Sequence, residues 1–512
     1  MNHYLSGIIK LVLLEASVGL WLLDAATKDQ FAKAKRVAYV SLAAAMLFAW
    51  SGYGGFRGTP ALVHTWEQFH FYLGAKYQTE VGWFDLYRAV LLADRESANV
   101  LSKVNETRNL HTFEPETVEA ALAQSDALRA RFSDARWNEF KSDWAYFAKL
   151  PIQWAPVLMD HGNSNSPAWA ILASPLTRLL PLSFASQTFL GALDMLLMVA
   201  LWAFAARTFG LRATAIGLVV FAAPINVFEY TAGSILRWDW LFACGMALCF
   251  LARGRYATAG AFWAYAVATK LFPLLFGVAL AFHWAWLTFN TRTVPRATVR
   301  FSAGAAASGI VIFALASAMF GGPGAWAEYK RRIDVTRDEK YYGIQYSLKT
   351  VFLQVVESSP RELLQSFPGK EVKQARADVD IRNHALSFVV VQLLFSTIVA
   401  LWARKATEVS AFTLGPVLVF IWLTVNMYYW CMLGLFALGL ALRTDRPSFG
   451  ALLGLPVTLG ALYVFQHLNR GWAEGLLVGS LWTMGLLAVG VSLAFAYSRE
   501  STKTPLPSRT NV

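Results

Sequence analysis

Glu67 and His70 lie three residues apart in the segment Trp66-Glu67-Gln68-Phe69-His70, and both have side chains that can move a proton. Residues at this spacing share one face of a helix, so a helical segment places the carboxylate beside the imidazole. A carboxylate in such a pair can act as a general base near neutral pH. We therefore predict Glu67 as a catalytic base and His70 as its positioning partner. The alternative is an ordinary Glu–His pair on the polar face of an amphipathic helix.

Two other acidic residues in the same polar region are reserve candidates for the base. Asp85 stands three residues before Arg88, and such a pair is more often structural. Asp160 opens the sequence Asp160-His161-Gly162-Asn163, which favours a turn. This turn is consistent both with a plain loop and with a group of side chains that bind sugar hydroxyls. Under the second interpretation, four residues at the two ends of the region bind a sugar or an acceptor: His64, Trp66, His161 and Asn163.

A basic cluster follows much later in the chain. Arginine and lysine bind phosphate oxygens through charged hydrogen bonds, so the cluster is predicted to bind the phosphate of a donor substrate. The alternative is attraction to anionic lipid headgroups without catalysis. Asp378-Val379-Asp380 imitates a metal-binding motif but stands alone, and we predict no metal site. The predicted phosphate-binding residues are Lys330, Arg331, Arg332, Arg337, Lys340, Tyr341 and Tyr342, together with Arg237 at the start of an apolar run.

The elements that must position these residues are membrane helices. The chain has 512 residues, of which 56% are hydrophobic, and its mean hydropathy is +0.41. Roughly ten apolar runs are long enough to cross a hydrocarbon core of about 30 Å as helices. They are too long for the strands of a membrane barrel. The sequence therefore predicts an all-α polytopic membrane protein with about 12–13 transmembrane helices.

The charged residues orient these helices. The net charge is +12, but most basic residues lie in short connections that alternate along the chain, so the charge predicts a topology and no nucleic-acid partner. By the positive-inside rule those connections are cytoplasmic, and the protein is predicted to lie in the cell inner (plasma) membrane. Cys244, Cys249 and Cys431 fall inside apolar runs, which excludes a disulfide framework and a Cys zinc site. Spans are predicted near 36–53, 184–206, 211–229, 238–253, 257–272, 274–290, 300–320, 386–403, 409–427, 428–442, 447–467 and 475–497.

The predicted organisation places two substantial loops on the extracytoplasmic, periplasmic side. Loop one, residues 54–183, contains the candidate base, and loop two, residues 321–385, contains the basic cluster. Within loop one we expect a helix over 114–131, an aromatic stripe on a helix over 134–149, and a stretch broken by Pro167, Pro175 and Pro181. The remaining parts are an interfacial or spanning helix with a basic cytoplasmic loop (1–35), a first main span (36–53), two transmembrane bundles (184–320 and 386–497) and a cytoplasmic tail (498–512).

Two segments give the chain a family resemblance. Gly233-Ser234-Ile235-Leu236-Arg237-Trp238-Asp239-Trp240 opens one span, and Lys270-Leu271-Phe272-Pro273 follows after the next. This pattern resembles the paired-helix signature of the GT-C membrane glycosyltransferases of the polyprenyl-phosphate-mannose-dependent alpha-mannosyltransferase type (glycosyltransferase family 87-like). The sequence Ser166-Pro167 through Pro175 is similar to the proline-rich stretch of that family. The family's Gly-Gln-x-Asn helix start and early catalytic Asp are not matched, since Gly233 is followed by Ser-Ile-Leu and the first acid of loop one is Glu67.

The resemblance implies a GT-C-like fold and an inverting, metal-independent transfer of mannose or a similar sugar. The implied donor is a polyprenyl-phosphate-linked sugar and the implied acceptor is a lipid or a glycan, with membrane lipids as the other partners and no cofactor. An enzyme of the O-antigen ligase or polymerase type is an alternative, although its large loop usually lies late in the chain. A transporter or flippase of lipid-linked saccharides is another, and it predicts inverted repeats that the sequence does not show.

Overall fold

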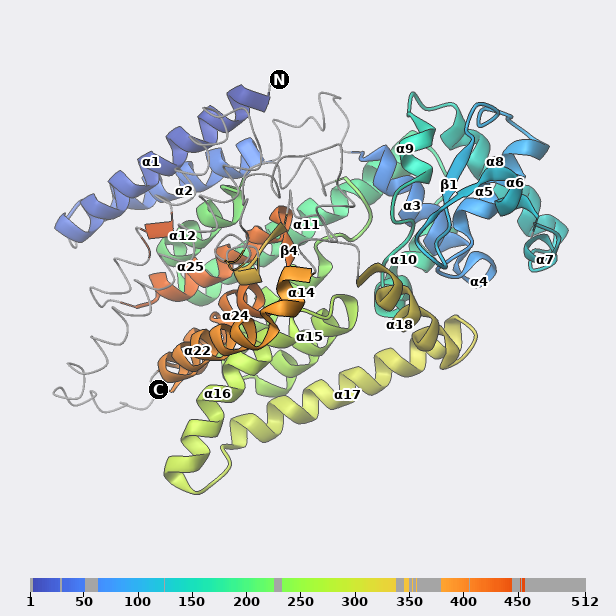
Figure 1. Ribbon diagram of the computed structural model, residues 1–512. Helices are drawn as coiled ribbons and strands as arrows, with labels where there is room; N and C mark the ends of the chain where they lie inside the picture. The colour runs from blue at the N-terminus through green and yellow to red at the C-terminus, as the bar shows by residue number, and fades with distance from the viewer. Residues whose placement is uncertain are drawn as a thin grey trace.

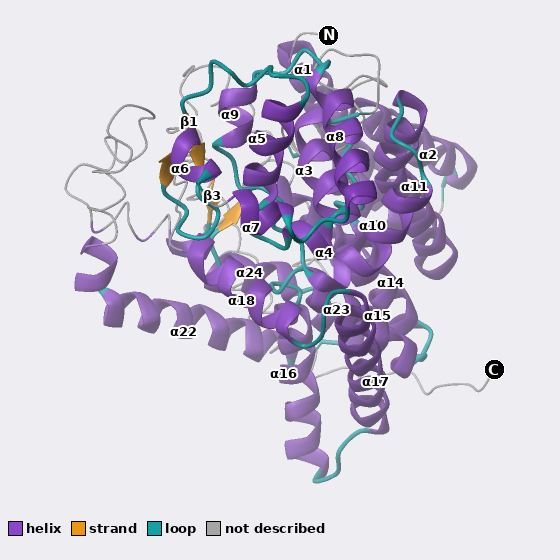
Figure 2. Cartoon of the chain, turned by 90° about the vertical axis from the view of Figure 1, so that its right-hand side faces the viewer, coloured by secondary structure: helices purple, strands orange, loops and turns teal. Residues whose placement is uncertain are grey.

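The computed structural model describes residues 3–27, 30–50, 63–123, 125–224, 233–337, 345–349, 379–404 and 406–443, together with Phe352, Val356, Leu452, Gly454 and Leu455. The described part is mostly helical, and its strands form two short two-stranded sheets (Figure 2). It divides into an outer domain built from loop one and a large apolar bundle (Figure 1). The mostly helical composition agrees with the predicted all-α class.

The outer domain contains eight of these helices and one hairpin. Its core is aromatic, and α3 and α8 contribute most of the large buried rings that its helices carry. β1 and β2 pair antiparallel, with Thr107 opposite Glu116. The elements in chain order are α3 (Thr65–Lys76), α4 (Gln78–Val81), α5 (Leu86–Glu96), β1 (Glu106–Arg108), β2 (Pro115–Thr117), α6 (Val118–Leu122), α7 (Ser125–Arg129), α8 (Asp134–Ala148), α9 (Trp154–Leu158) and α10 (Pro167–Leu179).

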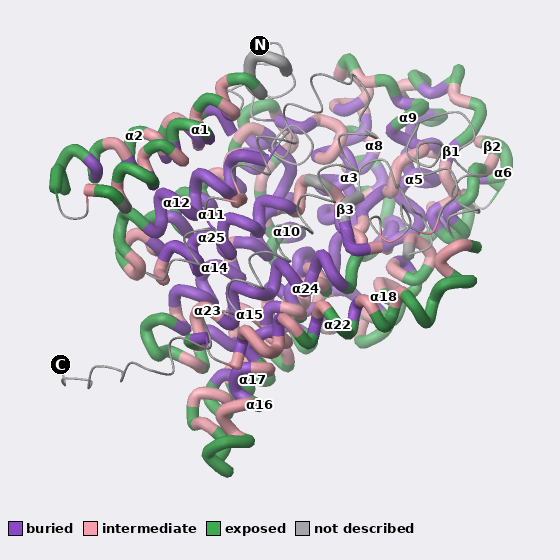
Figure 3. Tube along the Cα trace, turned by 60° about the vertical axis from the view of Figure 1, so that its left-hand side comes forward, coloured by how far each residue is buried: buried purple, intermediate pink, exposed green. Residues whose placement is uncertain are grey.

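The apolar bundle is formed by helices from both ends of the described chain. Its buried centre is α12, α14, α24 and α25, whereas α1, α2, α17 and α22 expose many residues (Figure 3). A strand after α18, β3 (Gln345–Tyr346), pairs with β4 (Val425–Asn426). The helices are α1 (His3–Thr27), α2 (Ala32–Trp50), α11 (Phe184–Phe209), α12 (Leu211–Ala222), α14 (Asp239–Ala252), α15 (Tyr256–Thr269), α16 (Leu274–Thr291), α17 (Arg296–Met319), α22 (Ala385–Ala403), α23 (Glu408–Phe412), α24 (Gly415–Trp422), η2 (Met427–Met432) and α25 (Leu433–Ala441). After α17, α18 (Gly324–Arg337) leaves the bundle and packs on the outer domain.

Four of the described helices are long and apolar enough to cross a membrane: α11, α16, α17 and α22. The exposed residues of these helices include large apolar side chains such as Phe313 on α17 and Leu394 on α22, which suit contact with lipid. The predicted span 409–427 is two short helices, because the chain turns at Thr413 and Leu414 and α24 restarts with Pro416 in its first turn. Of the last two predicted spans, all but Leu452, Gly454 and Leu455 lies outside the described residues.

Close packing inside the bundle depends on small residues. The backbones of α15 and α17 approach so closely that a Cβ at Gly260 would lie 2.0 Å from the Phe301 carbonyl oxygen. A Cβ at Gly304 would lie 1.9 Å from the carbonyl oxygen of Ala257. Helices in membranes associate through such close contacts of small residues, because the hydrophobic effect does not favour helix–helix contact over contact with lipid.

Loop one confirms one local prediction and corrects two. The stripe of Trp137, Phe140, Trp144 and Phe147 on α8 is buried in the domain core, which confirms the predicted helix. The predicted single helix over 114–131 is wrong, since Pro115 lies in β2 and the following residues form two short helices, α6 and α7. The first of these begins at Val118, where the Thr117 hydroxyl accepts from the Ala120 amide.

The second correction concerns the prolines of α10. Pro167 occupies the first turn of this helix, where its missing N–H costs nothing, and the Ser166 hydroxyl caps the end. Pro175 lies inside the helix, so the break expected there is wrong. α10 continues to Leu179, and Pro181 comes after its end.

Loop two lies against loop one through α18. The buried Arg332 guanidinium donates to the Leu110 carbonyl at 3.3 Å and to the His161 carbonyl. The Glu328 carboxylate accepts from the backbone N–H of Trp83 at 3.5 Å. The two loops that the sequence places on one side of the membrane are therefore in contact with each other.

Candidate functional site

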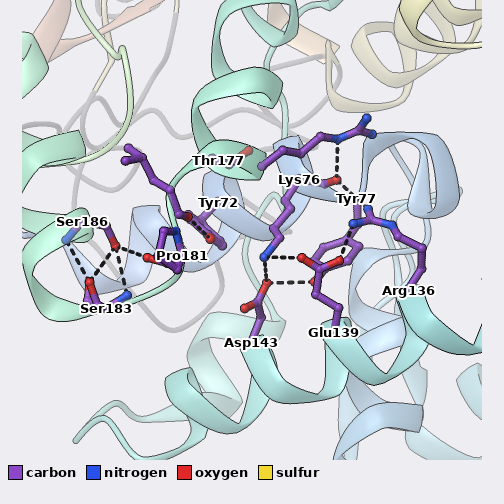
Figure 4. Close-up of polar contacts among 12 residues, drawn as sticks. Tyr72, Lys76, Tyr77, Arg136, Glu139, Asp143, Thr177, Pro181, Ser183 and Ser186 are labelled. Atoms are coloured by element: carbon purple, nitrogen blue, oxygen red, sulfur yellow. Dashed lines mark hydrogen bonds and ion pairs between the residues drawn. The ribbon is translucent and has the colours of Figure 1, made fainter.

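The C-terminal end of α3 is held by a buried charge network (Figure 4). The Lys76 ammonium lies 2.7 Å from Asp143 and 2.9 Å from Glu139 of α8. The Tyr77 hydroxyl donates to the same Asp143 carboxylate at 2.8 Å. Arg136 donates to the Lys76 carbonyl at 2.9 Å, which satisfies an end of the helix that would otherwise lack a partner. This network fixes α3 against the rest of the outer domain.

The N-terminal end of α3 is tied to the bundle. The backbone N–H of His64 donates to the Gly233 carbonyl at 2.9 Å. The buried Gln68 side-chain amide donates to the same carbonyl and to the Gln187 carbonyl, each at 2.8 Å. Glu67, which lies between these two residues, is thereby held beside the turn that precedes α14.

That turn presents Arg237 to Glu67. The two side chains form an ion pair with 3.1 Å between the guanidinium Nη1 and the carboxylate Oε2, and they are 12% and 17% exposed. The guanidinium also lies over the rings of Phe71 and Tyr428, at 5.3 and 5.6 Å from their centroids. Burial opposes the charge of Arg237, but Glu67 and the tyrosines nearby hold its pKa above the ordinary value. A permanent cation is therefore kept beside the carboxylate.

A second cation comes from the end of α15. Lys270 follows the last residue of that helix, and its ammonium donates to the Asn165 side-chain oxygen at 3.3 Å. It interacts electrostatically with Arg237, Asp239 and Glu67. Asp239, the first residue of α14, accepts from the Tyr265 hydroxyl at 2.8 Å. We call Glu67, Arg237, Asp239 and Lys270 the junction cluster, because they join the outer domain to the ends of α14 and α15.

His70 shares α3 with Glu67, as predicted, but it has other partners. Its Nε2 lies 2.9 Å from the Tyr87 hydroxyl, which donates to the Val157 carbonyl and accepts from the Gly162 amide. Burial lowers the pKa of His70 to about 4, so the imidazole is neutral at neutral pH. The structure assigns this side chain a place in the core of the outer domain.

The low pKa of His70 predicts a pH-dependent stability. The folded protein binds this proton less readily than the unfolded chain, whose histidines titrate near pH 6.5. The free energy of unfolding is therefore expected to fall by roughly 3 kcal/mol as the pH drops from about 6.5 to about 4. The measurement is the unfolding midpoint of the full-length protein in detergent across this range. His70→Asn should flatten the slope, and an unchanged slope in that variant would contradict the assignment.

The other two candidate bases, Asp85 and Asp160, form ion pairs or hydrogen bonds with residues of loop one. Asp85 pairs with Arg88 at 3.4 Å, as the spacing predicted, and also with His111 at 3.1 Å and Arg131 at 2.9 Å. Burial opposes its ionisation, but His111 and Arg131 hold the pKa of Asp85 below its ordinary value. Its partners come from α5, the β1–β2 hairpin and the segment after α7, so this carboxylate links three parts of the domain.

Asp160 accepts a hydrogen bond from the indole Nε1 of Trp66. Burial opposes its ionisation, but His70, His161 and this indole hold the pKa of Asp160 below its ordinary value. The His161 ring packs on Phe113 with 5.1 Å between centroids. Asp160, Trp66 and His161 thus gather around the turn between α9 and α10.

Two of the predicted sugar-binding residues adjoin the junction cluster. His64 caps α3, and its Nδ1 accepts from the Glu67 amide at 3.4 Å. Asn163 accepts from the side-chain amide of Asn165 at 3.2 Å, and Asn165 in turn accepts from Lys270. The Asn163 side chain fits against Gly74, where a Cβ would lie 2.5 Å from its Nδ2. His64 therefore contacts the cluster directly, and Asn163 reaches it through Asn165.

The predicted basic cluster divides between two environments. Arg332 is buried and holds backbone carbonyls of loop one, whereas Arg331 lies over the Phe84 ring at 5.7 Å and Lys330 pairs with Asp334 at 2.5 Å. Arg337 ends α18. Lys340, Tyr341, Tyr342 and Asp378 lie outside the described residues. Among the predicted phosphate-binding residues that the structure describes, Arg237 is the one that forms an ion pair with Glu67.

Sequence reasoning noted Asp239 and Lys270 but did not join them to Glu67, and it missed Tyr265, Asn165 and Tyr428. The available signal was the set of ionisable residues at the ends of apolar helices, next to Pro273. Among the described residues, no group of three His, Cys, Asp or Glu side chains is arranged to hold a metal ion. No family model matches the sequence, and no curated protein matches it. The resemblance to the GT-C enzymes therefore stays a prediction.

Proposed function

We propose that the protein is an integral membrane glycosyltransferase that moves a sugar from a polyprenyl-phosphate-linked donor to a hydroxyl of a lipid or glycan acceptor. The single observation that carries the proposal is the junction cluster. It joins one carboxylate of the outer domain to two cations at the ends of apolar helices. A donor with a lipid tail needs cations at the ends of the apolar helices to bind its phosphate. An acceptor hydroxyl needs a base to remove its proton.

In the proposed reaction Glu67 takes the proton of the acceptor hydroxyl as the oxygen attacks the anomeric carbon. The bond from that carbon to the phosphate oxygen breaks, and the electron pair leaves with the polyprenyl phosphate. Attack opposite to the leaving group inverts the configuration. Arg237 and Lys270 stabilise the phosphate as its negative charge grows. Because the bound phosphate shares the Arg237 guanidinium, the Glu67 carboxylate becomes free to accept the proton.

The donor site is tested by binding of undecaprenyl phosphate to the purified protein in detergent. Arg237→Gln and Lys270→Gln are each expected to weaken binding by about 10- to 100-fold, since a hydrogen bond to a charged group contributes about 1.5–3 kcal/mol. The matched control is Arg253→Gln, an arginine at the other end of α14 that donates to Thr208. Equal affinity in wild type, Arg237→Gln and Lys270→Gln would remove the phosphate from this site.

The reaction itself is tested by transfer of labelled sugar from polyprenyl-phosphate-linked mannose, glucose and arabinose to a crude pool of lipid and glycan acceptors. Activity is expected to survive EDTA, since the two cations do the work of a divalent ion. Arg331→Ala is a useful second arm. An unchanged donor affinity assigns that exposed arginine to lipid headgroups, and a weaker one extends the phosphate site to α18.

A further inference from the structure

Asp194 is a fully buried carboxylate on α11 that contacts the turn before α14. Its Oδ1 accepts from the backbone N–H of Trp238 at 2.9 Å, and its Oδ2 has no hydrogen-bond partner among the described residues. A carboxylate inside a candidate membrane span is energetically unfavourable, so its presence points to a functional role. Here the acceptor holds the amide of the residue that directly follows Arg237.

The turn itself has a backbone that needs such support. Leu236 has a φ of +49°, in the left-handed region that residues with a Cβ avoid. The Gly233 carbonyl is held by His64 and Gln68, and the Ile235 carbonyl accepts from the Trp169 indole at 3.1 Å. Asp194 therefore supplies the acceptor for the amide end of a turn whose carbonyls are held by the outer domain.

We propose that Asp194 is a positioning residue that fixes the Gly233–Trp238 turn so that the Arg237 guanidinium faces Glu67 and the donor phosphate. The inference rests on the proposed function, because the phosphate is the group that Arg237 would bind. A carboxylate holds an amide through a charge-assisted hydrogen bond, whereas the side-chain oxygen of an asparagine makes a weaker, neutral one. Asp194→Asn should therefore release part of the turn while keeping the volume of the side chain.

A double-mutant cycle between Asp194→Asn and Arg237→Gln tests the positioning role. In the wild-type background, Asp194→Asn is expected to weaken binding of undecaprenyl phosphate by about 10- to 100-fold, as small displacements of a binding group do. In the Arg237→Gln background it should change the affinity by less than about twofold, since the group that it positions is gone. Met198→Leu, one turn further along α11 and equally buried, is the control for altered packing.

The outcomes separate the two proposals. An equal loss in both backgrounds would overturn the positioning role, because a general packing defect acts with or without Arg237. If the wild-type protein does not bind the probe, the proposed function fails, and the same cycle is then read from the thermal unfolding midpoints. Shifts of the midpoint that are smaller in the Arg237→Gln background would still support the positioning role. Additive shifts would overturn it.

Discussion

Glu67→Gln is expected to lower sugar transfer by about 10²–10⁴-fold, the usual contribution of a general base. Glutamine fills the same volume and can still accept a hydrogen bond from Arg237, so the loop and the turn should stay folded. The measurement is the transfer rate at saturating donor, with the unfolding midpoint recorded in parallel. Glu114→Gln, an exposed acid of the same loop, is the control and should retain full activity.

A Glu67→Gln variant with full activity would move the base to another acid. Asp160 is the next candidate, since it gathers with Trp66 and His161, while Asp85 is held by two arginines and His111. A variant that loses transfer and also has a much lower unfolding midpoint would show instead that the Glu67–Arg237 pair is mainly structural.

Lys76→Met is expected to lower the stability of the outer domain by about 3–5 kcal/mol, the usual effect of removing one partner of a buried ion pair. The Asp143 carboxylate would lose its cation while burial already raises its pKa. The measurement is the unfolding midpoint of the full-length protein, together with protease cleavage within loop one. Lys141→Met is the control, since Lys141 pairs with the partly exposed Glu96.

A double variant distinguishes charge from packing in this network. Lys76→Met with Asp143→Leu removes the charge of both partners and is expected to recover most of the loss, to within about 1–2 kcal/mol of wild type. Failure of the second substitution to recover stability would mean that the Tyr77 hydroxyl and the shape of the site matter more than the ion pair.

Local patterns predicted the helices of loop one where their period was strong. The stripe on α8 repeats at helical spacing with four large aromatic residues, so burial and secondary structure point to the same answer. The segment 114–131 misled because Glu114-Pro115-Glu116 also suits a strand at a sheet edge. There the β1 partner, not local propensity, decides the structure.

The bundle was predictable in outline from apolar run length, since α11, α16, α17 and α22 match predicted spans. The site was not predictable in the same way. The spacing of Glu67 and His70 placed both on α3, but their side chains pair with Arg237 and Tyr87, which lie 170 and 17 residues away. Such pairs depend on how distant segments of the chain pack against each other, and a single sequence contains no direct signal for this packing.

The contact of Arg332 with loop one has a consequence for the order in which the protein is made. The Leu110 and His161 carbonyls accept from a guanidinium that is synthesised more than 170 residues later than the second of them. The helices α11 to α17 lie between them in the chain, so all of these are synthesised before the outer domain has its last partner. The outer domain is therefore incomplete during synthesis until α18 has followed them.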